Sequence, residues 1–223
     1  SGRLGGGTQR AFEGKRRHHD SAASDEPLIH RERVGKIETA ALTLPQQEYS
    51  LYYNGYANSA LRPLFHYRLD LVQHRSEFLH ASTEANARFA KALARLLQAM
   101  MLIWVHDYHL IPLAAALRRF GFGNRIGFSP YTFPPPDLFV ATPDHGELIA
   151  DLLQHDVLDF QTETDVMNFQ RSVRATGSTT KSNGRIVLSR SFPIGIDVGE
   201  DVQIDSSAAI LGLKQIIGVD RLD

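Results

Sequence analysis

The strongest local signal in the sequence is the run His106-Asp107-Tyr108-His109, which places a carboxylate among imidazoles and a phenol. Such a carboxylate can act as a general base, accept hydrogen bonds from sugar hydroxyls or contribute to a metal site. It can also cap a helix by accepting hydrogen bonds from backbone amides, and capping is compatible with the other roles. No further cluster of histidines and carboxylates has the spacing of metal ligands, so the pattern favours a polar site without a metal.

Aromatic and amide side chains are dense upstream of this run, in Tyr52 to Asn58 and in Phe65-His66-Tyr67-Arg68. That composition is typical of carbohydrate sites, where rings cover the apolar faces of a sugar and amides bond its hydroxyls. Most such rings are expected in a core, so composition alone leaves open which of them touch a ligand.

The elements that must position these residues alternate between helices and strands. An amphipathic helix is predicted over residues 78–100, and an apolar strand over 101–105 ends at His106. The pattern then repeats, with helices near 110–120, 147–154 and 164–173 and strands at 125–129, 157–160, 185–189 and 215–219. This alternation predicts an α/β fold with a doubly wound, Rossmann-like parallel sheet and right-handed crossovers. The uninterrupted apolar strand at 101–105 is expected to be buried on both faces.

Ligands of such a sheet bind at the carboxyl ends of its strands. Three polar loops follow predicted strands, namely 106–109, Pro130 to Pro136 and Gln161 to Asp165, so we expect them to converge on one edge. Arg221 follows the last predicted strand, where a guanidinium could bind phosphate, although an arginine near a chain end is usually just solvated.

The overall composition excludes several classes of partner. Among 223 residues, 24 Lys and Arg stand against 25 Asp and Glu, and a formal net charge of −1 disfavours nucleic acid and anionic membranes. Cysteine is absent, which excludes disulfides and thiolate metal sites and fits a reducing compartment. No apolar run approaches the ~18 residues of a membrane-spanning helix. We therefore expect a cytoplasmic globular protein.

The first 48 residues differ from the rest. Three consecutive glycines, Gly5 to Gly7, are followed by a charged stretch that can bury little apolar surface. A phosphate-binding glycine loop is not favoured, because no apolar strand precedes the glycines. We expect a flexible or irregular segment over residues 1–48.

Taken in order, these pieces resemble the trehalose-6-phosphate synthase family, whose members are GT-B type glycosyltransferases with two Rossmann-like domains. The resemblance covers Tyr49 to Asp223. The matching stretches are Tyr52 to Asn58, Phe65 to Gln73, Ile103 to Leu110, Asn124 to Phe128, Phe160 to Glu163, Phe192 to Ile196 and Val219 to Asp223.

This resemblance implies transfer of glucose from UDP-glucose to glucose 6-phosphate, with retention at the anomeric carbon and without a metal or cofactor. Carried over by position, Tyr53 would contact the acceptor phosphate, and Gln161 would bond the acceptor sugar. Asp107 and Tyr108 would hold the acceptor beside the reacting centre, with Asp107 as the first candidate for catalysis. Arg221 matches the arginine that neutralises the donor phosphate.

The chain departs from the family pattern at three positions. Arg62 stands where the family has a tryptophan in the acceptor wall, so a cation replaces a ring beside the sugar phosphate. Tyr131 stands at the position of a catalytic histidine, and Asp159 replaces a glycine. A phenol titrates near pH 10 and an imidazole near 6.5, so a tyrosine donates a hydrogen bond there but does not transfer a proton at neutral pH.

The resemblance also predicts how the chain is organised. Residues 49–213 would form the acceptor-binding domain, and residues 214–223 the first strand of a nucleotide-sugar-binding domain that the chain lacks. The family's first strand has no match upstream of Tyr49. We therefore expect this chain alone to be incomplete or inactive.

Two alternatives to this activity, and the oligomeric state, remain open at this stage. One is a non-catalytic relative that still binds sugar phosphates. The other is a related transferase with another acceptor, such as glycerol 3-phosphate or a cyclitol phosphate, which Arg62 and Tyr131 would permit. A homo-oligomer is compatible with the sequence.

Overall fold

The computed structural model describes residues 29–182 and 184–194. The strand predicted at 215–219, the domain boundary near residue 214 and Arg221 lie outside the described residues. No helix in the described part of the chain is long and apolar enough to cross a lipid bilayer.

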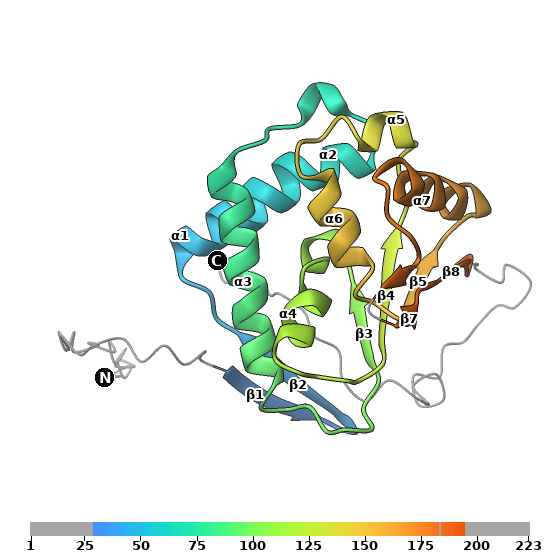
Figure 1. Ribbon diagram of the computed structural model, residues 1–223. Helices are drawn as coiled ribbons and strands as arrows, with labels where there is room; N and C mark the ends of the chain where they lie inside the picture. The colour runs from blue at the N-terminus through green and yellow to red at the C-terminus, as the bar shows by residue number, and fades with distance from the viewer. Residues whose placement is uncertain (1–28, 183, 195–223) are drawn as a thin grey trace, which may run out of the picture.

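A parallel four-stranded sheet forms the centre of the fold (Figure 1). Its strands lie in the order β3, β4, β5, β8, and every neighbouring pair is parallel. Their bounds are Ile103–His106, Ile126–Tyr131, Val157–Phe160 and Leu188–Ser191. The helices between them are α4 (Leu113–Arg119), α5 (Pro136–Phe139), α6 (His145–Leu152) and α7 (Glu163–Ala175). The predicted α/β fold with a parallel sheet is confirmed, and β5 coincides with the predicted strand.

The helices cover one face of this sheet. Buried side chains of α4, α6 and α7 join Val105, Phe128 and Leu158 in one apolar cluster. Because the strand order follows the chain in one direction, right-handed crossovers place successive helices on the same side. The described residues therefore form one half of a doubly wound arrangement, in which the helices cover a single face of the sheet.

The opposite face is partly open within the described residues. Trp104 of β3 is 37% exposed and Leu188 of β8 is 43% exposed. The Trp104 ring lies across Gly127, where an added Cβ would come within 2.4 Å of it. The expectation that the strand at 101–105 is buried on both faces is therefore wrong at Trp104, since no helix of the described part covers it.

The remaining described elements form a helical layer and two antiparallel hairpins. The helices are α1 (Gln46–Tyr49), α2 (Arg62–Phe65) and α3 (Ser76–Leu93), with the π-helical segment η1 (Ser50–Leu61) and the 3-10 turns η2 (Leu69–Leu71) and η3 (Tyr108–Leu110). The antiparallel strands are β1 (Ile29–Val34) with β2 (Ile37–Leu42), and β6 (Lys181–Ser182) with β7 (Arg185–Ile186).

Three sequence predictions differ from the structure. The strand predicted at 185–189 is divided between β7, which belongs to a hairpin, and β8, which belongs to the central sheet. Residues 29–42, predicted as part of an irregular segment, form a regular hairpin that turns at Gly35 with φ +62°. The helix predicted over 78–100 ends at Leu93 and is followed by a tight turn. The apolar periodicity continues through that turn, so it does not mark the end of the helix.

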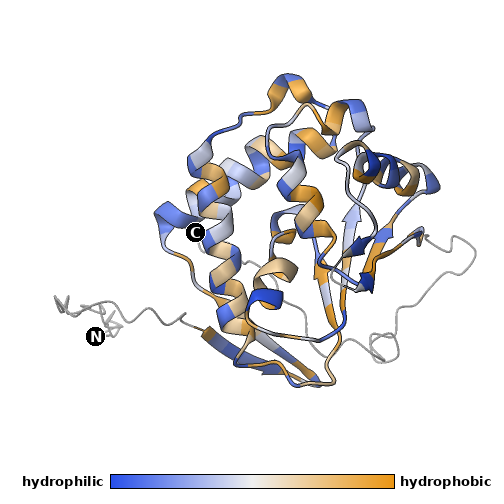
Figure 2. Cartoon of the chain, viewed as in Figure 1, coloured by the Kyte–Doolittle hydropathy of each residue, from blue (hydrophilic) through white to orange (hydrophobic). Residues whose placement is uncertain are grey.

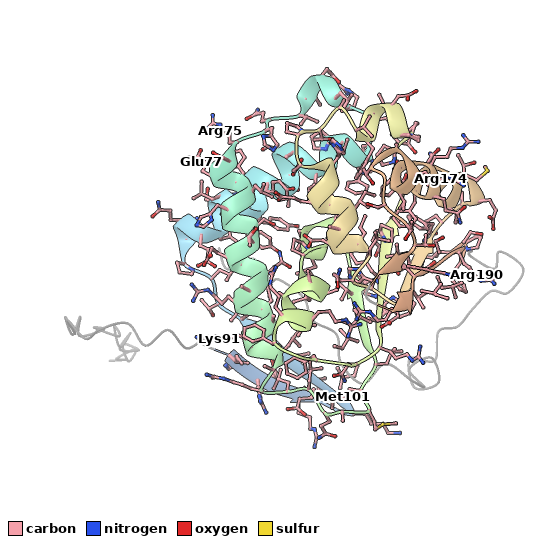
Figure 3. The ribbon with its side chains drawn as sticks, in the orientation of Figure 1. Arg75, Glu77, Lys91, Met101, Arg174 and Arg190 are labelled. Carbon is pink, nitrogen blue, oxygen red and sulfur yellow. The ribbon has the colours of Figure 1, made fainter. Side chains whose placement is uncertain are left out.

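Amphipathic packing sets the orientation of the longer helices. Ala81, Ala85 and Phe89 of α3 are buried, while Arg75 and Glu77 near its first turn lie on the outside (Figure 3). Figure 2 shows α7 as mainly hydrophilic, with apolar positions between the polar ones. The apolar stripe of each helix therefore faces the interior.

The aromatic core is centred on Phe133, which is fully buried in the loop after β4. Its ring contacts one ring each from α2, α5, β5 and α7, with centroids 4.9 to 6.0 Å apart. These partners are Phe65, Phe139, Phe160 and Phe169. One side chain thus joins elements that are far apart in the sequence.

We predict that Phe133→Ala lowers the free energy of unfolding by about 3 to 5 kcal/mol, because it leaves a cavity among four rings. Urea denaturation followed by circular dichroism measures this loss. Phe120→Ala is the matched control, since Phe120 is 54% exposed and its truncation should cost less than about 1 kcal/mol. Equal losses in the two variants would contradict a central role for Phe133.

Candidate functional site

Three non-glycine residues of the described chain have positive φ angles, and all three lie at or beside the carboxyl edge of the sheet. They are Tyr67 with φ 62°, Asp107 with φ 75° and Tyr131 with φ 63°. Asp107 follows β3, Tyr131 ends β4, and the Tyr67 hydroxyl lies 3.3 Å from the Phe133 carbonyl oxygen. Such conformations cost about 1 to 3 kcal/mol each and cluster at functional sites.

Asp107 has a polar neighbour at each carboxylate oxygen. Its Oδ1 accepts a hydrogen bond from the Tyr108 amide at 2.7 Å, so it caps η3 as the sequence suggested. Its Oδ2 lies 3.4 Å from Nδ1 of His109. Burial acts to raise the pKa of Asp107, but His109, the Tyr108 amide and the Arg62 charge together outweigh it and lower the pKa. Asp107 is therefore an ionised, half-buried carboxylate at neutral pH.

Tyr53 and Tyr108 lie beside this carboxylate. Burial, followed by the Asp107 charge, raises the pKa of Tyr53 and raises that of Tyr108 to about 12. Both phenols therefore keep their protons and can donate hydrogen bonds to a ligand. Tyr108 also stacks on Phe65 of the aromatic core at 6.1 Å between centroids.

Arg62, the first residue of α2, faces the same group from another element. Its charge lowers the pKa of Asp107 and acts to lower those of Tyr53 and Tyr108. The side chain is exposed, and within residues 29–182 and 184–194 it makes no hydrogen bond or ion pair. The guanidinium is therefore available for an anion.

Tyr131 projects from a tight turn at the end of β4. The Thr132 amide donates to the Pro130 carbonyl at 2.8 Å and closes a three-residue turn around it. Its own carbonyl accepts from the Gln161 amide at 3.2 Å. The phenol is 43% exposed, so it is accessible to a ligand at this edge.

Gln161 follows β5, next to Tyr131. Its side-chain Oε1 accepts from the Ile194 amide at 3.0 Å, while its Nε2 is buried and has no partner in the described part of the chain. A buried donor without an acceptor is costly, so Nε2 is suited to a hydrogen bond with a ligand oxygen.

The structure therefore brings the predicted site residues together in two groups. Tyr53, Arg62, Asp107 and Tyr108 interact with one another, whereas Tyr131 and Gln161 are joined through the main chain at the next two strand ends. No interaction links the side chains of the two groups among the described residues. The charged side chains, Arg62 and Asp107, both belong to the first group.

Sequence reasoning missed the residues that support the loop carrying Tyr131. Asp165, 5% exposed, accepts hydrogen bonds from the Phe133 amide at 2.8 Å and from the hydroxyls of Thr132 and Thr162 at 3.1 and 2.5 Å. Asn168 donates to the Phe133 carbonyl at 3.0 Å. The spacing of Thr162 and Asp165 is that of a helix capping motif, which could have indicated their position at the start of α7.

We predict that Asp165→Ala loosens this loop, because it leaves the Phe133 amide without an acceptor. Hydrogen exchange at that amide, followed by NMR, should accelerate, with a loss of about 2 kcal/mol in the free energy of unfolding. Asp165→Asn keeps an acceptor oxygen and should retain most of the protection. Asp137→Ala, at an exposed acid of α5, serves as the control; unchanged exchange in Asp165→Ala would contradict this role.

Comparison with known proteins gives a consistent match along most of the chain. A family model described as glycosyltransferase family 20 matches residues 6–223. A trehalose-6-phosphate synthase from Enterobacter sp. (strain 638) is 37% identical over 218 residues, covering 89% of this chain and 46% of that protein. The match begins well upstream of Tyr49, so the resemblance extends further toward the N-terminus than its motifs indicated. The chain spans about half the length of the curated relatives it matches.

Solved structures agree with this match. A structure from E. coli bound with UDP-2-fluoro glucose has a TM-score of 0.72 and 38% identity, and the alignment covers 80% of this chain and 41% of that one. A UDP-forming alpha,alpha-trehalose-phosphate synthase from Burkholderia xenovorans, in complex with glucose-6-phosphate, has a TM-score of 0.71 and 36% identity, covering 78% and 41%.

Proposed function

The chain belongs to glycosyltransferase family 20, and we propose that it supplies the acceptor-binding part of a retaining transferase that moves glucose from UDP-glucose to glucose 6-phosphate. The proposal depends mainly on the charge state and position of Asp107. It is an ionised carboxylate in a strained conformation at the carboxyl edge of a parallel sheet, where ligands of such folds bind.

In this proposal the acceptor lies over the charged group. Asp107 accepts hydrogen bonds from hydroxyls of the acceptor and holds the attacking oxygen in place, while Tyr108 donates to the sugar. Tyr53 and Arg62 bind the acceptor phosphate, for which the phenol offers a donor and the exposed guanidinium a charge-assisted pair. Because both phenols have raised pKa values, they stay protonated across the neutral range and do not repel the phosphate.

Gln161 and Tyr131 act from the two neighbouring strand ends. The buried Nε2 of Gln161 donates to the acceptor sugar, and the Tyr131 phenol donates a hydrogen bond near the reacting centre. Tyr131 does not serve as a proton shuttle at neutral pH, because a phenol titrates too high. Arg221 would neutralise the donor phosphate as UDP leaves.

A cytoplasmic location is part of this proposal, because both substrates carry phosphate charges and do not cross a bilayer unaided. A transferase that uses another phosphorylated acceptor, such as glycerol 3-phosphate, is the second candidate. Arg62 permits it, since a cation binds a phosphate group whatever polyol carries it.

Calorimetric titration of glucose 6-phosphate into this chain tests the proposal. We expect saturable binding that Asp107→Ala weakens at least about tenfold, because charge-assisted hydrogen bonds to the acceptor are lost. Glu77→Ala is the matched control, since it removes an exposed carboxylate on the outside of α3 (Figure 3).

The titration with glycerol 3-phosphate and an assay of UDP-glucose consumption separate the alternatives. Tighter binding of glycerol 3-phosphate would favour the second candidate. Binding of glucose 6-phosphate without consumption of UDP-glucose would support an acceptor half-site alone, and no binding of either phosphate would contradict the proposal.

Arg62 makes a further prediction about phosphate recognition. Arg62→Gln should weaken binding of glucose 6-phosphate about tenfold, because a charge-assisted pair with the phosphate is lost. Binding of glucose, which has no phosphate, should change little, and the ratio of the two dissociation constants measures the difference. An equal loss for both ligands would assign Arg62 to the sugar ring or to folding.

A further inference from the structure

His109 is fixed in place by buried hydrogen bonds to its main chain. Its carbonyl oxygen accepts from the Tyr52 hydroxyl at 3.2 Å and from Nδ2 of Asn86 at 3.1 Å. Tyr52 and Asn86 have no exposed surface, and they come from η1 and α3. Two elements of the helical layer thus hold the turn that follows β3.

The ring of His109 is confined as tightly as its backbone. It makes edge contacts with the rings of Tyr52, Tyr53 and Tyr108 at centroid distances of 5.9, 5.4 and 6.4 Å. Only 10% of its side-chain surface is exposed. Packing against three tyrosine rings therefore restricts the positions that the imidazole nitrogens can take.

The Nδ1 atom of this ring is directed at the catalytic candidate. It lies 3.4 Å from Oδ2 of Asp107, beyond an ordinary N–H···O hydrogen bond, and it makes no hydrogen bond in the described part of the chain. Hydrogen bonds of this kind are often long before a ligand binds. The other oxygen of the carboxylate is already bonded to the Tyr108 amide.

We infer that His109 is a positioning residue for Asp107. Its Nδ1–H donates to Oδ2, so that this contact and the Tyr108 amide fix both carboxylate oxygens in one orientation. This inference rests on the proposed function, in which Asp107 holds the attacking hydroxyl of the acceptor. His109 itself is largely buried and acts through the carboxylate.

These contacts orient the side chain of a residue whose backbone is strained. Asp107 combines φ 75° with ψ 143°, a region that is almost exclusive to glycine. A side chain tied at both oxygens keeps one rotamer in spite of that strain. The ionisable groups that act on Asp107 are His109 and Arg62, and the carboxylate in turn acts on Tyr52, Tyr53 and Tyr108.

Two substitutions separate positioning from packing. His109→Phe keeps an aromatic ring of similar size among the tyrosines but has no donor. His109→Asn loses the ring but keeps an amide N–H at the place of Nδ1, because its Nδ2 is equally far along the side chain. If His109 acts only through packing, His109→Phe should resemble the wild-type chain more closely. If it positions Asp107, His109→Asn should do so.

The pKa of the Asp107 carboxyl, measured by carbon-13 NMR of the ligand-free chain, is the first readout. We expect His109→Phe to raise it by about one unit, since a hydrogen bond to the charged form is lost, and His109→Asn to leave it near the wild-type value. An unchanged pKa in His109→Phe, or a larger rise in His109→Asn than in His109→Phe, would overturn the inference.

Titration of glucose 6-phosphate is the second readout. We expect His109→Phe to weaken binding about tenfold and His109→Asn to weaken it less. Should the wild-type chain bind no glucose 6-phosphate while the Asp107 pKa responds as expected, the pairing would stand and the proposed function would fall. Equal binding by the wild-type chain and His109→Phe would overturn the positioning role.

Discussion

The candidate site depends on Phe133, whose ring and backbone anchor the same point of the fold. Its ring contacts rings from α2, α5, β5 and α7, while its amide and carbonyl bond Asp165 and Asn168. Because Phe65 meets Phe133 edge to face and stacks on Tyr108, the core also sets the position of a residue in the site. The packing of the core and the geometry of the site therefore depend on the same side chains. A substitution in one is expected to alter the other.

This anchoring explains how the chain tolerates strain at its carboxyl edge. Asp107 and Tyr131 have left-handed φ angles that together cost several kcal/mol, at about 1 to 3 kcal/mol for each residue. Both lie at the ends of strands whose inner faces are buried, so the burial that fixes β3 and β4 offsets the strain there. Both residues are partly exposed at this edge, with 36% for the Asp107 side chain and 43% for Tyr131.

Much of the fold could be predicted from periodicity, and much of the site from the resemblance. Apolar runs located β3, β4 and β5. Asp107, Tyr53 and Tyr108, chosen from the resemblance, lie close together, and their roles stay predictions. The hairpin at 29–42 was missed because its first strand reads as charged residues, and only the turn at Gly35 marks it. The contact of His109 with Asp107 could not be predicted, because it depends on a positive φ that no sequence pattern encodes.

The open face of the sheet gives the chain a built-in optical reporter. Trp104 is the single tryptophan in the sequence, and its indole donates to the Ser129 hydroxyl at 3.1 Å while its ring covers Gly127. All indole emission therefore originates from one partly solvated position on β3. A segment or partner that packs on this face would shift that emission to shorter wavelength, so such a contact can be followed without an added dye.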